Sequence, residues 1–325
     1  MTSYGQPCRF PGAIADRLRL PVIAAPMLRV SGPELVIAAC RAGVIGAFPT
    51  ANARTVDDLD CWLTAITEAD RCAEGDDPVA PYAANLIIRQ PRLRDDLACL
   101  VRHRVELVIT SVGSPASVVG PLHEVGALVL ADVATLAHAR KAVEAGADGL
   151  VLLSAGAGGQ TGWLNPFAFV CAVRDFFPGP IVLAGGISDG QGLFAAQVLG
   201  CDLAYLGTSF IATRESMASP VYRDMLVEAT IDDVMLTKAF TGLPTSMLAP
   251  AIRAAGLDPD TLDEHVTPAA AEQMYGGKSP GIGPKRWTDV RSAGHSVSGV
   301  HGVVSVAELV DRLAKEYRAA RECNR

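Results

Sequence analysis

Short apolar runs alternate with longer helical patterns along the first two thirds of the chain. Continuous apolar runs bounded by glycine or polar residues are typical of parallel strands covered on both faces. The pattern predicts eight strands, at Pro21–Ala25, Val44–Phe48, Tyr82–Ile88, Leu107–Ser111, Ala127–Ala131, Gly149–Leu153, Ile181–Ala184 and Leu203–Leu206. Eight repeats of strand then helix favour an α/β fold of the (β/α)8 TIM-barrel type over an open doubly wound sheet, although the sequence leaves the open sheet possible.

The segments between these strands carry helix signals. Helices are expected at Pro33–Ala42, Thr55–Ala69, Thr135–Ala145 and Asn165–Asp175. The last stretch, Ser305–Ala320, has apolar residues at helical spacing and a serine at its start, which is a favoured N-cap. We expect this helix to complete the outer ring of the barrel.

The pattern changes after Phe210. Residues 214–290 contain helical stretches but no clear βα unit, which predicts a smaller helical lobe inserted after strand eight and packed over the barrel mouth. The barrel then comprises residues 1–213 and 291–325. Five apolar residues are expected to form the core of the lobe, with a substrate pocket or a subunit contact as alternatives: Met235, Phe240, Leu243, Met247 and Leu248.

The loops after strands seven and eight predict a phosphate site. They contain Gly185, Gly186, Gly207 and Thr208. Glycines let backbone N–H groups approach an anion closely, and TIM barrels commonly hold a phosphate at these two loops. The alternative is that the glycines only form tight turns.

Three other strand ends carry unusual residues. Strand one ends in Ala25-Pro26-Met27, and Asn85 is an amide within an apolar strand. Loop six, from Ser154 to Gly162, is rich in glycine, which suits a backbone lying flat against a planar ligand. Gln160 stands in this loop and is expected to point into the mouth; a merely flexible loop is the alternative.

Composition excludes several functions. The net charge of −7 argues against nucleic-acid binding, because phosphate backbones require a concentrated basic face. No apolar run approaches the length of a membrane span and the N-terminus lacks a secretory pattern, so we expect a cytoplasmic protein acting on a small molecule. The eight cysteines form no CxxC pair, which predicts free thiols and no metal site. The sequence leaves a homo-oligomer open.

Longer stretches resemble the nitronate monooxygenase family, formerly called 2-nitropropane dioxygenases. The resemblance covers most of the chain and rests on PVIAAPMLRVSGPELVIAACRAGVIGAF at the start, ANL at 84–86, AGAGGQTG at 155–162, LAGGISDGQGLFAAQVLGCDLAYLGTSFIATRES at 183–216 and RSAGHSVSGVHGVVSVAELVDRL near the end. The stretch through loops seven and eight is its most specific part.

The resemblance implies non-covalent FMN on a barrel, with a helical domain over the isoalloxazine ring. The phosphate would lie on the four loop residues named above. The ring would lie near Ala25, Pro26, Met27 and Asn85, with Gly158 and Gly159 beside its reactive edge; Asp132, at the end of strand five, falls at another cofactor-contacting position.

Two positions depart from the family pattern. The family usually has histidine after the glycine pair of loop six, as catalytic base or hydrogen-bond donor, and this chain has Gln160. A glutamine amide cannot accept a proton near neutral pH. His295 or His301, in a glycine-bearing connector, could take over, whereas His103, His123 and His138 are expected on the outer surface. The second departure is Ser209, where relatives often have arginine.

The resemblance therefore implies an FMN-dependent monooxygenase that oxidises nitronates or similar carbanions with O2. One alternative is an FMN-dependent reductase or dehydrogenase of a C–C double bond, with NAD(P)H as a transient reductant. Others are a non-catalytic flavin-binding protein and a flavin-free barrel enzyme acting on a sugar phosphate.

Overall fold

The computed structural model describes residues 9–72, 79–276 and 284–324. Eight parallel strands close into a barrel in the order β1-β2-β3-β4-β5-β6-β8-β9, which confirms the TIM barrel. The barrel strands are β1 (Val22–Ala24), β2 (Ile45–Pro49), β3 (Tyr82–Ile87), β4 (Leu107–Ser111), β5 (Leu128–Val133), β6 (Gly149–Leu153), β8 (Ile181–Ala184) and β9 (Leu203–Leu206). All eight expected strands are present, with ends shifted by at most a few residues.

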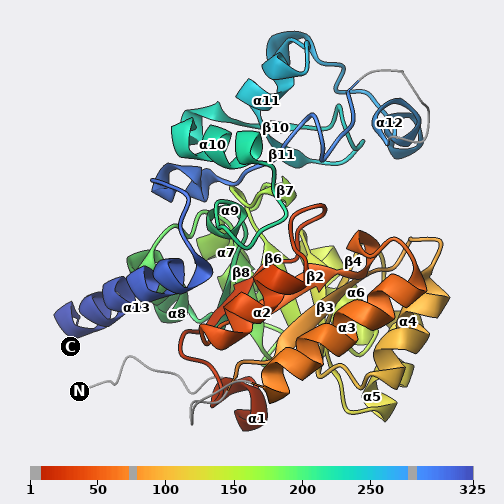
Figure 1. Ribbon diagram of the computed structural model, residues 1–325, viewed down its shortest axis with the longest axis vertical. Helices are drawn as coiled ribbons and strands as arrows, with labels where there is room; N and C mark the ends of the chain where they lie inside the picture. Colours follow the sequence, from red (N-terminus) through yellow and green to blue (C-terminus); the bar gives the residue numbers. More distant parts are fainter. Residues whose placement is uncertain (1–8, 73–78, 277–283, 325) are drawn as a thin grey trace.

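Helices surround this barrel (Figure 1). They are α2 (Pro33–Arg41), α3 (Val56–Arg71), α4 (Leu93–Arg102), α5 (Ala116–Glu124), α6 (Leu136–Glu144), α7 (Pro166–Arg174), α8 (Gly190–Leu199) and the C-terminal α13 (Val306–Cys323). Helix α13 starts at an N-cap Ser305 that forms a capping box with Glu308, and it packs against α8 and α2. It therefore completes the outer ring, as its sequence predicts.

The barrel interior is filled by inward-facing apolar side chains. This core includes Ile23, Ile109, Val151 and Val182, each fully buried. The short helix α1 (Gly12–Ala15) adds Ile14 to the same cluster and closes the end where the strands begin. The opposite end, where the strands finish, is left for a binding site.

The lobe lies beyond the carboxyl ends of the strands, at the top of Figure 1. It contains the expected helices, α10 (Pro220–Glu228), α11 (Ala249–Ala254) and α12 (Pro268–Tyr275), with the very short helix α9 (Thr208–Ile211) leading into it. It also contains two strands that the sequence did not reveal, β10 (Val234–Thr237) and β11 (Thr245–Leu248). They form a three-stranded antiparallel sheet with β7 (Gly159–Gln160) of loop six.

The lobe has its own apolar core. Phe240 and Met247 are fully buried there and Met235 packs against them, while Leu248 belongs to a neighbouring cluster. Leu243 is the exception among the five expected core residues, because it is 40% exposed and lines the large cavity below the lobe.

Candidate active site

A cavity of about 1060 Å³ lies between the barrel mouth and the lobe. This volume is at the upper end of the range for small-molecule sites, enough for a cofactor and a substrate together. Every predicted site residue lines it: Ala25, Pro26, Met27, Asn85, Asp132, Gly158, Gly159, Gln160, Gly185, Gly186, Gly207 and Thr208. The closed barrel brings these positions together because all its strands end at the same edge.

The loop after β8 has a backbone that favours glycine. Gly185 has φ +127° and Gly186 has φ +71°. A Cβ on Gly185 would lie 2.4 Å from Ser154 Oγ, so this glycine allows loops six and seven to pack closely. A Cβ on Gly186 would have no atom within 4 Å, and this residue lines the cavity. Gly186 thus presents bare backbone to whatever binds there.

The loop after β9 forms one corner of the cavity together with the loop after β8. Gly207 is the N-cap of α9, whose first backbone N–H groups have no partner within the helix itself. The Thr208 hydroxyl accepts a hydrogen bond from Gly294 N at 2.9 Å and so secures the chain returning from the lobe. Ser209, which replaces the arginine of many relatives, is buried, and its Oγ has no hydrogen-bond partner.

Loop six is held by both domains. Gly159 and Gln160 pair with Ser246 and Thr245 of β11. At the barrel side, Thr161 donates its hydroxyl hydrogen to Ser154 O at 2.7 Å. Gln160 is therefore on a fixed strand at the cavity wall and not on a merely flexible loop.

Polar side chains form the floor of the cavity. Asn85 donates through Nδ2 to Ile109 O at 3.0 Å and to Ser111 Oγ at 3.1 Å. Asp132 Oδ1 and Tyr205 Oη are both buried without a hydrogen-bond partner. Burial raises the pKa of Asp132 to about 7, and burial together with the Asp132 charge raises the pKa of Tyr205.

Tyr205 is a site residue that the sequence analysis missed. It lies inside β9, two residues after the inward-facing Leu203. Because side chains alternate along a strand, this spacing could have indicated that Tyr205 also faces the barrel interior. Other cavity residues with no sequence signal come from α6 and the lobe, namely Lys141, Tyr222, Arg286, Trp287 and Arg291.

Comparison with known proteins gives a family match over most of the chain. Residues 14–316 match the family described as nitronate monooxygenase. The chain belongs to the nitronate monooxygenase family. Membership places the chain among the flavin-dependent oxidoreductases.

Three similar proteins span different activities. A nitronate monooxygenase of Paraburkholderia phytofirmans is 27% identical, with 93% of each chain covered. The (3aS,4S,5R,7aS)-5-hydroxy-7a-methyl-1-oxo-octahydro-1H-indene-4-carboxyl-CoA dehydrogenase of Mycobacterium tuberculosis is 28% identical over 70% of this chain, and the match spans only 62% of that dehydrogenase. The solved structure of FabK from Thermotoga maritima aligns with a TM-score of 0.78 and 27% identity, covering 96% of this chain and 97% of that one.

His295 and His301, the two histidines expected to be able to take over from the family's loop histidine, are not placed to do so. Neither His295 nor His301 lines the cavity, and both are exposed. The His295 ring packs beside Gly156 of loop six. His138 is exposed on α6, as expected, and it also lines the edge of the cavity.

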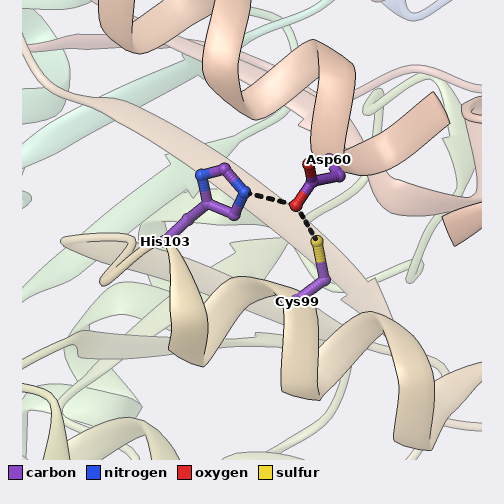
Figure 2. A group of neighbouring side chains, drawn as sticks. All are labelled: Asp60, Cys99 and His103. Carbon is purple, nitrogen blue, oxygen red and sulfur yellow. Dashed lines mark hydrogen bonds and ion pairs between the residues drawn. The ribbon is translucent and has the colours of Figure 1, made fainter. Parts of the chain in front are cut away.

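A second cluster of polar residues lies far from the cavity, between α3 and α4 (Figure 2). His103 Nε2 is 2.8 Å from Asp60 Oδ1, and Cys99 Sγ is 3.9 Å from the same oxygen. Arg102 also donates to this oxygen at 2.7 Å, and this hydrogen bond contributes most to lowering the pKa of Asp60. Burial raises the pKa of the Cys99 thiol. Because the Arg102 guanidinium binds the shared oxygen and the Cys99 thiol is neutral, we interpret this cluster as an ion-paired link between α3 and α4.

The seven cysteines among the described residues are free, as predicted, and Cys8 lies outside them. No helix in the described ranges is long and apolar enough to cross a membrane.

Proposed function

We propose that this protein is an FMN-dependent oxidoreductase that oxidises nitronates or similar carbanionic small molecules with O2. The observation that carries the proposal is the convergence of the predicted FMN residues on one cavity, with the phosphate loops at one corner and Gln160 at the wall. Bound FMN would supply the redox chemistry, while the protein binds and orients the reactants.

The corner formed by loops seven and eight suits the FMN phosphate. Gly186 leaves space where a side chain would otherwise stand, and its backbone is open to the cavity. The start of α9 adds backbone donors without any lysine or arginine. The unpartnered polar atoms of Asp132 and Tyr205 on the floor also suit a ligand that offers hydrogen-bonding groups.

The planar ring would lie against small and apolar surfaces. Ala25, Pro26 and Met27 form one part of the cavity wall, with Asn85 beside them, while Gly158 and Gly159 form another. Gln160 follows directly and would donate an amide hydrogen bond to an anionic substrate oxygen. An ionised nitronate needs no deprotonation, so this role suits it.

A second candidate is the reduction or dehydrogenation of a C–C double bond, with NAD(P)H as transient reductant. The volume of the cavity, about 1060 Å³, leaves room for a substrate larger than a small nitronate. The similarity to FabK and to the indene-carboxyl-CoA dehydrogenase supports this candidate.

The visible spectrum of the purified protein, followed by aerobic mixing with a small alkyl nitronate, tests both candidates. A flavin spectrum with O2 consumption is the expected result. Flavin without O2 consumption, but with NAD(P)H oxidation on adding an enoyl thioester, would favour the second candidate. Flavin without turnover of either kind would indicate a non-catalytic flavin protein, and a protein that stays colourless with added FMN would contradict the proposal.

The Gln160→Leu variant tests the amide. Leucine keeps the size but removes the donor, so kcat/KM for an alkyl nitronate should fall about 10- to 100-fold, the effect of losing one hydrogen bond to a charged group. FMN binding should not change. Gln160→His, which retains a ring N–H donor, is the matched control and should keep most of the activity. Equal activity of the Gln160→Leu variant and the unaltered protein would show that the Gln160 amide does not act on the substrate.

A further inference from the structure

Proton transfer requires a group that Gln160 cannot provide. The titratable or charged side chains lining the cavity in the described residues are Arg89, Asp132, His138, Lys141, Tyr205, Tyr222, Glu272, Arg286 and Arg291. Most of these are exposed or already engaged. His138 and Lys141 are exposed on α6, Tyr222 Oη donates to Ser292 O, and Arg286 pairs with Glu272.

Asp132 is different because it lies at the inner floor of the cavity. Inward-facing residues of β5 alternate along the strand, and Asp132 follows Leu130 of the barrel core at this spacing. Its Oδ1 is buried and has no partner. Tyr205 comes from β9, three strands away around the barrel, and its Oη is also buried without a partner. Two unsatisfied polar groups at the floor of one cavity are costly unless a ligand uses them.

We propose that Asp132 is the proton acceptor and donor of this active site. This inference rests on the proposed function. In the step, the Asp132 carboxylate takes a proton from the carbon beside a nitro or carbonyl group. The C–H bond breaks, an O–H bond forms on Asp132, and the electron pair stays on the substrate as the nitronate or enolate. No oxidant is needed until the later oxidation by O2.

The protonation state of Asp132 fits this role. Its pKa is raised to about 7 by burial, and Tyr205 is the titratable neighbour whose own pKa responds to the Asp132 charge. The carboxylate form needed to accept a proton is therefore populated above pH 7. Because the native pKa lies above the ordinary value near 4, the native protein holds an extra proton between these values, and its stability falls as pH rises through this window.

Deuterium exchange tests the proton step separately from the oxidation. Nitroethane is incubated with the FMN-loaded protein in D2O without O2, and loss of the α-hydrogen signal is followed by NMR. We expect exchange catalysed by the unaltered protein, at least about 100-fold slower exchange with Asp132→Asn, and partial recovery with Asp132→Glu. Asp148→Asn, at the start of β6 and away from the cavity, is the control and should behave as the unaltered protein.

Two readouts distinguish the outcomes. With O2 present, the ratio of the rate on nitroethane to the rate on its preformed nitronate should fall about 100-fold in Asp132→Asn. An equal loss on both substrates, or weaker FMN binding alone, would overturn the proposal and make Asp132 a cofactor contact. Thermal unfolding should show Asp132→Asn gaining more stability over the unaltered protein at pH 8 than at pH 5. Exchange by the unaltered protein without O2 consumption would refute the proposed oxidation only, and no exchange would refute the role of Asp132.

Discussion

Replacing Gly186 with leucine is expected to abolish FMN binding and leave the barrel folded. Gly186 has φ +71°, and a side chain there would extend into the cavity corner proposed for the phosphate. Losing two backbone hydrogen bonds to a phosphate removes about 3–6 kcal/mol, which weakens binding more than 100-fold. Titration of the apoprotein with FMN, followed by flavin fluorescence, measures this change.

Backbone strain must be separated from loss of the phosphate site. A leucine at positive φ costs roughly 1–2 kcal/mol of stability wherever it is placed. Gly126 has φ +82°, has space around its Cβ position and does not line the cavity. Gly126→Leu should therefore lose similar stability but bind FMN normally. A Gly186→Leu protein that purified yellow with full flavin would show that the phosphate lies elsewhere.

Replacing Asp202 with alanine is expected to lower the free energy of unfolding by about 3–5 kcal/mol, because it leaves a largely buried arginine without its counterion. The Asp202 side chain is only 2% exposed and lies 2.8 Å from Arg174. It also accepts hydrogen bonds from the backbone N–H groups of Ile181 and Arg9. This cluster fixes the start of β8 and β9, the strands that lead into the two loops proposed to hold the phosphate. Urea denaturation of the two proteins measures the difference.

Asp148 offers the matched comparison. It holds the start of β5 in the same way, accepting from Val129 N at 2.8 Å, but its side chain is 31% exposed and its other partner is His123. Asp148→Ala should cost roughly 1–3 kcal/mol, since water replaces part of what is lost. Equal losses in the two variants would mean that the buried Arg174 pair adds nothing to stability.

Much of the fold is determined locally. Each barrel strand is a mainly apolar run, and the helices between the strands carry cap signals, such as Thr55 with Asp58 at α3. Strands that are buried on both faces are apolar at most positions, so the eight strands could be located from the sequence. The two glycines of loop seven were also visible, and the positive φ at Gly185 and Gly186 explains why glycine stands there.

The lobe sheet could not be predicted from the sequence. Strands β10 and β11 are four residues each, and their partner β7 lies more than 70 residues earlier in the chain. An isolated two-stranded hairpin is marginally stable in water. The sheet depends on contacts that form only when loop six and the lobe meet, and local patterns do not record such contacts.

The sequence by itself determined the barrel, the position of the glycine loops proposed to hold a phosphate, and the family. Only the tertiary structure decided which polar groups face the cavity. It excluded His295 and His301 from the wall, and it placed Tyr205 together with Asp132 among the residues that line the cavity. The physical reason is that burial and charge coupling arise between strands distant in the chain, and a pKa responds to the surroundings that these strands create.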